Sequence, residues 1–314
     1  MFSHVMRSLH FLLISKGVYQ LLAIATLVLA IVNPKVNFPR DFRNYVFVID
    51  ITQSMNVEDM HFDDHSVSRL NFSLNLLSAS IKELSCGTKV SIALFANAEI
   101  VPLYVPLEIC ANHTIIEDTL SHIEWRMAWR GSSHLRLGLI DASRVLLFLP
   151  ESAQIIFLTD GDEAAPINAI TKIDLRPMPE SNGWLLAGVG SLTASPIPKF
   201  NSKNEIIGFW SQYATKIEPS QIVSEESLGK RDDSIATDPH EYYLSALKED
   251  YLKEMTNDIG ATYVRANSKD HFLAAINELP PSGYGKTPTN FGWFFAVLAI
   301  LLILVEYLPI SSSK

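Results

Sequence analysis

The fold is decided by residues 45–54, which read YVFVIDITQS. The first five residues form a continuous apolar run, which is typical of a strand buried on both faces of a parallel sheet. The run ends at Asp50, and alternate positions then carry Thr52 and Ser54, so three oxygen-bearing side chains leave the strand on one side of the chain. This stretch predicts a central strand with polar groups at its carboxyl end.

A second apolar run, residues 154–158 (QIIFL), predicts another buried strand, and it ends in a TDG sequence that contains Asp160. The carboxyl ends of parallel strands meet at one edge of a sheet, so we expect Asp160 beside Asp50. The Gly/Ser loop at residues 130–134 precedes a predicted helix and can bring Ser133 to the same edge.

These side chains carry the oxygen atoms that hard cations prefer, since Mg²⁺ takes about six oxygen ligands. The hydroxyls can bind the ion directly, and the carboxylates can bind it directly or through water. Neutral hydroxyl ligands leave the ion electrophilic, so it favours a further carboxylate from outside. The sequence therefore predicts a site for Mg²⁺, or for Ca²⁺ or Mn²⁺, formed by five residues: Asp50, Thr52, Ser54, Ser133 and Asp160.

The rest of the chain predicts alternating strands and helices. The expected elements are helices at 68–84, 114–123, 135–149, 242–259 and 270–279, strands at 184–189 and 262–265, and a hairpin at 89–95 and 99–105. This order predicts an α/β domain with three layers, doubly wound, with a mostly parallel sheet and one antiparallel edge hairpin.

The two cysteines, Cys86 and Cys110, flank the predicted hairpin. If the hairpin turns near residues 97–98, the residue opposite Cys86 is near 109, so a disulfide is within reach. Such a bridge would stabilise the fold by about 3 kcal/mol. It would also indicate an oxidising compartment such as the bacterial periplasm. Two buried free thiols are the alternative.

Two segments are apolar enough to cross a hydrocarbon layer of about 30 Å as helices. We expect an N-terminal region, 1–32, with a transmembrane helix at about 11–32. A soluble domain at 33–290, a second transmembrane helix at 291–308 and a tail at 309–314 follow. A cleaved signal peptide is the alternative for the first segment, and a buried core helix for the second.

The formal net charge of −9 argues against a nucleic-acid partner. Trp125 and Trp129 are interpreted as packing residues rather than ligand-stacking residues. A group of acidic and histidine residues follows the predicted metal ligands at residues 50–54. It is interpreted as a solvated rim that screens partners by charge, with a second calcium site as the alternative. The group consists of Glu58, Asp59, His61, Asp63, Asp64 and His65.

The D-x-[ST]-x-S trio, the Gly/Ser loop and the TDG strand end, in this order, resemble the metal-ion-dependent adhesion site of von Willebrand factor A (VWA) domains. The resemblance implies a VWA fold, a divalent cation on the five residues named above, and an acidic residue of a protein partner that completes the metal site. Thr52 and Ser133 stand where Ser and Thr are usual, but both keep an oxygen ligand.

A closer resemblance covers nearly the whole chain, and it is to the MxaL-type methanol-oxidation accessory proteins. These are membrane-bound VWA proteins encoded beside a MoxR-type AAA+ ATPase. The resemblance implies an inner-membrane protein whose periplasmic domain helps to mature a methanol dehydrogenase, including its calcium loading, together with other VWA subunits. The matching pieces are DITQSM at 50–55, Cys86-Gly87, LEICAN at 107–112, RMAW at 126–129, SPIPKF at 195–200 and GFW at 208–210.

We expect no enzymatic activity. The enzyme alternative is a haloacid-dehalogenase-like phosphatase, with Asp50 as nucleophile and Gly161-Asp162-Glu163 as its metal loop. Thr52 then stands where a proton-donating carboxyl group is needed, which argues against this alternative. A structural membrane assembly subunit with a degenerate metal site is the second alternative.

Overall fold

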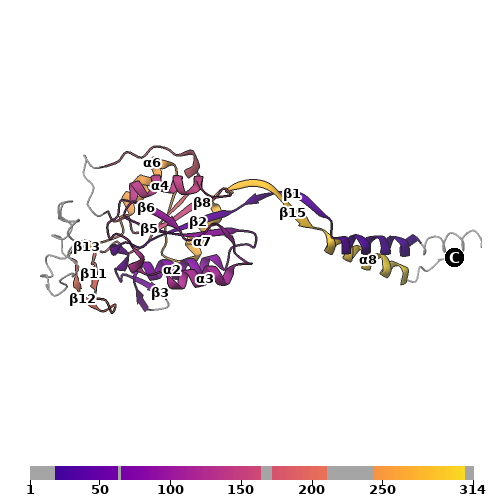
Figure 1. Cartoon of the computed structure of the whole chain (residues 1–314), viewed down its shortest axis with the longest axis horizontal. Helices are drawn as coiled ribbons and strands as arrows, with labels where there is room; N and C mark the ends of the chain where they lie inside the picture. Colours follow the sequence, from indigo (N-terminus) through magenta and orange to yellow (C-terminus); the bar gives the residue numbers. More distant parts are fainter. Residues whose placement is uncertain (1–17, 63–64, 164–171, 211–242, 308–314) are drawn as a thin grey trace, which may run out of the picture. The chain divides into compact units, whose positions relative to one another are not determined.

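The computed structural model describes residues 18–62, 65–163, 172–210 and 243–307 (Figure 1). The chain divides into two compact units. The larger unit is Phe42–Gly283, and the smaller one combines Met1–Asp41 with Tyr284–Lys314. Each unit is described separately below.

The larger unit is built on one central sheet. Its strands are β2 (Asn44–Asp50), β5 (Lys89–Ala96), β6 (Glu99–Pro102), β7 (Leu107–Glu108), β8 (Gln154–Thr159), β9 (Leu185–Gly188) and β14 (Thr262–Arg265). The strand order is β14-β9-β8-β2-β5-β6, and β7 pairs with β5. Neighbours from β14 to β5 are parallel, whereas β6 and β7 run antiparallel to β5. The predicted mostly parallel sheet with an antiparallel edge hairpin is confirmed.

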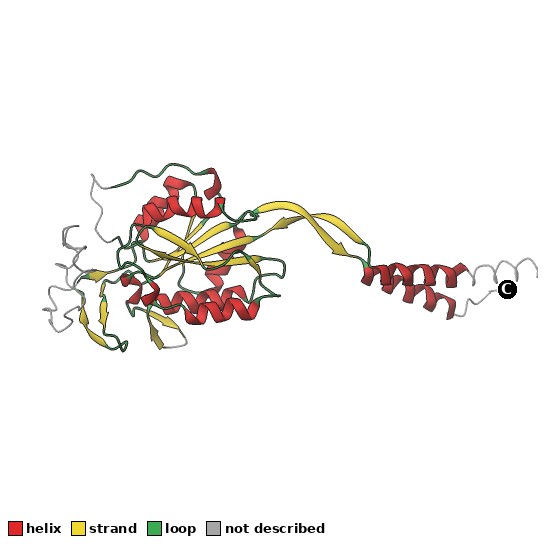
Figure 2. Ribbon diagram, viewed as in Figure 1, coloured by secondary structure: helices red, strands yellow, loops and turns green. Residues whose placement is uncertain are grey.

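Helices cover both faces of this sheet and complete the three layers (Figure 2). One face carries α2 (Arg69–Ile81), α3 (His113–His122) and α7 (Lys269–Glu278). The other face carries α4 (Leu135–Leu147) and α6 (Glu249–Ile259).

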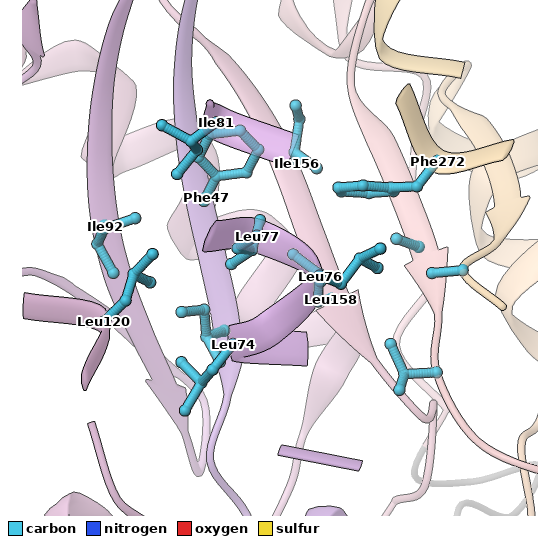
Figure 3. Close-up of a cluster of buried hydrophobic side chains, with 14 of the residues drawn as sticks. Phe47, Leu74, Leu76, Leu77, Ile81, Ile92, Leu120, Ile156, Leu158 and Phe272 are labelled. Carbon is cyan, nitrogen blue, oxygen red and sulfur yellow. The ribbon is translucent and has the colours of Figure 1, made fainter. Parts of the chain in front are cut away.

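Strand β2 lies at the centre and contributes to both cores. Phe47 and Ile49 pack with α2, α3 and α7, while Val46 and Val48 pack with α4 and α6. Figure 3 shows the first of these cores, in which Phe47 lies near Ile81 of α2. A strand buried on both faces has no solvent side, which explains the unbroken apolar run in its sequence.

The hairpin edge carries the disulfide that the sequence suggested. Cys86 and Cys110 are bridged, with their Cα atoms 5.4 Å apart. The second hairpin strand is shorter than predicted, because β6 ends at Pro102. Pairing resumes at β7, where Lys89 opposes Glu108. If the β5–β6 register continued, residue 106 would lie opposite Lys89. The pairing register therefore shifts by two residues between β6 and β7.

Short elements lie outside the central sheet. The paired strands are β3 (Met60–Phe62) with β4 (His65–Val67), β10 (Ser195–Pro196) with β13 (Leu244–Ser245), and β11 (Pro198–Phe200) with β12 (Ile206–Phe209). The 3-10 helices are η1 (Gln53–Asn56), η2 (Trp125–Met127) and η3 (Pro179–Ser181).

The helix predicted at 242–259 starts later than expected, and this part of the prediction is wrong. Residue 242 lies outside the described residues, β13 occupies Leu244–Ser245, and α6 begins at Glu249. The cause is tertiary: Leu247 N–H donates to Ser191 O (2.9 Å), and Lys248 N–H donates to Asp160 O (2.9 Å). These bonds fix the segment in an extended course beside Asp160 before the helix can start.

In the residues that the structure describes, the smaller unit contains two strands and two helices. β1 (Lys35–Phe42) pairs with β15 (Gly283–Asn290), so the predicted domain 33–290 includes a ribbon that the contacts place mostly in this unit. Residues 18–32 and α8 (Gly292–Tyr307) are helical and expose many apolar side chains. Gly292 N–H donates to Asn33 Oδ1 at 3.0 Å, which ties the end of one helix to the start of the other.

Both helices coincide with the segments predicted to span a membrane. Among the residues that the structure describes, however, no helix combines the length and apolar character needed for a crossing. Residues 11–17 and 308 of the predicted spans, and the tail 309–314, lie outside the described residues. The two spans therefore stay a prediction.

Candidate metal centre

The candidate site begins where β2 ends. Asp50 is completely buried, and its Oδ1 accepts hydrogen bonds from Thr52 N–H (2.9 Å) and from Thr52 Oγ1 (2.6 Å). The Oγ atoms of Thr52 and Ser54 lie 3.5 Å apart, and both residues are buried. Because the Thr52 hydroxyl gives its proton to Asp50, its lone pairs are available for a cation.

The end of β8 meets the end of β2 directly. Thr159 Oγ1 donates to Asp50 Oδ2 at 2.6 Å, which joins the two strand ends. Asp160 follows, is fully buried, and accepts a hydrogen bond from Asp162 N–H at Oδ1 (2.9 Å). Gly161 then turns the chain with a φ of +75°, a conformation that favours glycine.

The Ser133 loop is attached to the turn of the β5–β6 hairpin. Asn97 N–H donates to Ser132 O at 2.8 Å, and His134 N–H donates to Asn97 O at 2.5 Å. Asn97 follows the end of β5, where Phe95 pairs with Asp50. These contacts bring the loop to the strand ends that carry Asp50.

Ser133 itself has an unusual hydroxyl. The residue is 3% exposed, and its Oγ has no hydrogen-bond partner among the described residues. Buried hydroxyls in proteins are nearly always bonded, so an unpaired one indicates a missing ligand or water. The predicted metal residues therefore come from three loops that meet at one edge of the sheet.

The two carboxylates of the site are electrostatically coupled. Burial and, second, the nearby charge of Asp160 raise the pKa of Asp50 from 3.8 to about 7. Hydrogen bonds from Thr159 and Thr52 lower the pKa only in part. A cation between these groups would relieve both desolvation and repulsion, so the charge distribution fits a divalent metal.

Sequence analysis missed Arg69, the first residue of α2. Its guanidinium is fully buried, with Nη1 at 2.7 Å from Asp160 Oδ2 and Nη2 at 2.6 Å from Asp59 Oδ2. Nη1 also donates to Ser245 Oγ (2.8 Å). Asp59 is thus half of a buried ion pair and not part of a solvated rim. Of the remaining rim residues, Asp63 and Asp64 lie outside the described residues.

Sequence analysis weighed Asp162 and Glu163 only for the phosphatase alternative. Glu163 Oε1 accepts from Leu135 N–H (3.0 Å) and from Tyr251 Oη (2.9 Å), so it holds the start of α4 just after the Ser133 loop. Burial raises the pKa of Glu163 to about 6. Burial and the charge of Asp160 also raise the pKa of Asp162, whose Oδ1 accepts from Tyr243 Oη at 3.1 Å. The position of these two acids directly after the TDG sequence is the signal that could have placed them at the site.

The arrangement favours hydroxyl ligands with carboxylates behind them. Asp50 accepts three hydrogen bonds, and both Asp160 oxygens also have partners. The hydroxyls of Thr52, Ser54 and Ser133 are therefore the groups best placed to contact a cation, and Asp50 and Asp160 balance its charge directly or through water. A second grouping of Cys86, Glu108 and Cys110 is close enough for a metal, but the disulfide engages both sulfurs.

Comparisons with known proteins agree with this fold. No family model matches the chain, and no curated protein matches its sequence. Among solved structures, an aerotolerance-related membrane protein from Bacteroides fragilis is 18% identical, with a TM-score of 0.50 over 76% of this chain and 98% of that one. The likeness shows a shared fold.

Two further structures are more distant. An uncharacterised membrane-spanning protein from Vibrio fischeri is 16% identical, with a TM-score of 0.29 over 76% of this chain and 97% of that one. A von Willebrand factor type A protein from Catenulispora acidiphila is 16% identical, with a TM-score of 0.34 over 49% of this chain and 36% of that one. These two likenesses are too weak to carry an argument, so the resemblance to VWA domains and the narrower resemblance to MxaL-type proteins both stay predictions.

Proposed function

We propose that the protein is a membrane-anchored VWA-like module that binds a protein partner through a divalent metal. The ion, Mg²⁺ or alternatively Ca²⁺ or Mn²⁺, would be held by the hydroxyls of Thr52, Ser54 and Ser133, with Asp50 and Asp160 close behind. A carboxylate of the partner would complete its coordination.

The observation that carries this proposal is the buried Oγ of Ser133, which has no hydrogen-bond partner among the described residues and belongs to a loop at the same sheet edge as a buried carboxylate pair. A hydroxyl without a partner and two acids with excess negative charge are both unfavourable alone. One cation satisfies all three groups. Its neutral ligands would leave it electrophilic, which favours an added anionic ligand from outside.

We further propose that the domain lies in the periplasm and is anchored in a bacterial inner membrane by two spans. The disulfide favours an oxidising compartment. The resemblance to MxaL-type proteins supports a role in maturing or metal-loading a periplasmic enzyme such as methanol dehydrogenase. Other VWA subunits and a MoxR-type ATPase would belong to the same system.

A phosphatase is disfavoured by the environment of Asp50. Its two carboxylate oxygens accept hydrogen bonds from Thr52 and Thr159, so neither is a free nucleophile. We therefore propose that the protein is not an enzyme. A phosphatase assay that compares the native protein with Asp50→Ala tests this: activity lost only in the variant would contradict the proposal.

The remaining alternative is a structural assembly subunit whose metal site is unused. Calorimetric titration of the full chain in detergent with Mg²⁺ and Ca²⁺ separates the two. We expect saturable binding that Ser54→Ala and Asp160→Ala each weaken at least about tenfold. No heat with either metal, and no difference in the variants, would favour the structural subunit.

The partner is identified by affinity purification from membranes in Mg²⁺. We expect a protein that is recovered with the native chain and released by EDTA. Ser54→Ala, which removes one hydroxyl and keeps the charge, is the matched control and should recover much less of it. Equal recovery with Ser54→Ala and in EDTA would contradict metal-dependent binding.

A further inference from the structure

A small pocket opens beside the metal loop, on the side of α2. Its volume is about 250 Å³, and it lies between η1, the start of α2, η2 and β11. Asn56, at the end of the same 3-10 helix that carries Ser54, forms part of its lining. The pocket and the predicted metal ligands are therefore less than one helical turn apart along the chain.

The pocket has an apolar wall with an aromatic pair. Trp125 and Phe200 line it, with ring centroids 5.5 Å apart, and Leu70 and Ile123 add aliphatic surface. Trp125 packs against Phe200, as predicted for a packing residue. It also lines the pocket. Such walls suit the methylene stem of a long side chain or a cation near the ring.

Two carboxylates stand at the rim. Glu58 and Glu124 both line the pocket, both are exposed, and neither forms an ion pair with any residue that the structure describes. Arg126 lies over the Trp125 ring, and its guanidinium donates to Asn204 Oδ1 at 2.9 and 2.7 Å. The rim is therefore acidic on balance.

Two of the N–H groups at the start of α2 are already engaged. A helix amino terminus attracts anions through its free N–H groups. Here Arg69 N–H already donates to Val57 O (3.0 Å), and Asn71 N–H donates to Ser68 Oγ (3.1 Å). These donors are not available to a ligand.

One residue that lines the pocket carries a polar group without a partner among the described residues. Asn56 is 3% exposed, and its Nδ2 has no hydrogen-bond acceptor among the described residues. A buried amide donor of this kind is satisfied by a carbonyl oxygen, such as that of a peptide.

We propose that this pocket receives the cationic side chain of a lysine or arginine from the protein partner. The ammonium or guanidinium group lies between Glu58 and Glu124, the stem packs on Trp125 and Phe200, and Asn56 Nδ2 donates to the peptide carbonyl of the same residue. The inference names the chemistry of the partner and so rests on the proposed protein-binding function. A partner segment would then carry an acidic residue for the metal and a basic residue for the pocket.

The test uses the full chain in detergent, labelled with 5-fluorotryptophan, and ¹⁹F NMR in EDTA. The probe is Nα-acetyl-lysine methylamide, and the norleucine analogue is its uncharged match. We expect a saturable shift of the Trp125 signal, assigned with Trp125→Phe, and a dissociation constant at least about fivefold larger for norleucine. The signal of Trp184, which is fully buried, reports that the fold is intact.

Variants assign the parts of the pocket. Glu58→Gln combined with Glu124→Gln should remove the preference for lysine over norleucine, whereas Glu180→Gln, an exposed acid elsewhere, should keep it. Asn56→Ala should weaken both probes by a similar factor, about threefold to tenfold, because it acts on their shared carbonyl.

Three results would overturn the proposal: equal shifts with lysine and norleucine, a larger shift with Nα-acetyl-glutamate methylamide, or no saturable shift. Because EDTA is present, a failure of the metal site does not affect this titration. Conversely, metal binding without lysine binding would leave the proposed function intact and reject only the pocket.

Discussion

At the scale of single residues, the site depends on how buried charges are balanced. Asp50, Asp160 and Asp59 are all held away from water at the edge of the sheet, and Arg69 is the cation that contacts two of them. The resulting balance leaves Asp50 without a positive partner among the described residues. Two consequences of this balance are measurable.

Arg69→Met is expected to destabilise the protein strongly, because it leaves Asp59 and Asp160 buried without their cation. Loss of one partner of a buried pair costs about 3–5 kcal/mol. Arg144→Met is the matched control, since the Arg144 side chain is 70% exposed and lies 3.8 Å from Asp141. Urea unfolding should separate the variants clearly. Equal midpoints would show that the Arg69 ion pairs do not stabilise the fold.

The pH dependence of stability follows from Asp50. Its pKa is 3.8 unperturbed and about 7 in the folded chain, so without metal the folded state holds an extra proton between these values. The stabilisation from this proton is complete below about pH 4 and is lost as pH rises through 7. We expect the Tm measured in EDTA to fall over this window.

Asp50→Asn should flatten the dependence, although not fully, because the raised pKa values of Glu163 and Asp162 act in the same direction. Glu163→Gln is the control that removes a neighbouring acid while keeping Asp50. A Tm in EDTA that rises between pH 4 and 7 in the native protein would contradict the assignment of a raised pKa to Asp50.

At the scale of elements, the hairpin edge and the fit of α4 against the sheet can be tested separately. The edge is closed by the Cys86–Cys110 bridge, with β6 and β7 paired to one strand. Helix α4 approaches the sheet closely at Gly138, which faces the ring of Phe95.

Removal of the bridge by Cys86→Ser with Cys110→Ser is expected to lower the unfolding free energy by about 3 kcal/mol, from the entropy of a loop of this size. Denaturant titration measures the loss. Reductant should reduce the stability of the native protein to a similar level and leave the double variant unchanged. A reductant effect on the double variant would indicate another cause.

Gly138→Ala tests the helix–sheet contact. A Cβ at this position would lie 2.4 Å from Phe95 Cε2, and Phe95 is fully buried and packed edge-on against Phe157. Overpacking costs about 1–3 kcal/mol, while the better helix propensity of alanine returns about 1 kcal/mol, so we expect a net loss. Gly283→Ala, whose nearest neighbour would be 3.6 Å away, is the control. A stabilised Gly138→Ala would show that the ring can move.

The elements that the sequence predicted well are those decided by local pattern. The apolar runs of β2 and β8 specify buried parallel strands on their own, and the polar residues that follow them locate the sheet edge of the candidate site. Residues whose role depends on distant partners were missed. Arg69 looked like an ordinary helical residue, because Asp160 and Ser245 lie 91 and 176 positions away. The segment before α6 was misassigned for the same reason.

At the scale of the whole molecule, the proposed topology places the larger unit on the periplasmic side of the membrane. Thr193 is exposed in a loop of that unit, so Thr193→Cys provides a reporter on a chain whose native cysteines are bridged. We expect a membrane-impermeant maleimide to label it in cells with a permeabilised outer membrane and an intact inner membrane. Labelling only after lysis of the inner membrane would place the unit in the cytoplasm.

Arg69 also constrains when the proposed metal centre can form during biosynthesis. It leaves the ribosome soon after Asp59, but 91 residues before Asp160 and 176 residues before Ser245. Until the chain has been made through β13, its guanidinium lacks the contacts that hold it beside the strand ends. The proposed centre is therefore completed late, and an export-arrested or prematurely terminated chain would carry the first predicted metal ligands without the framework that aligns them.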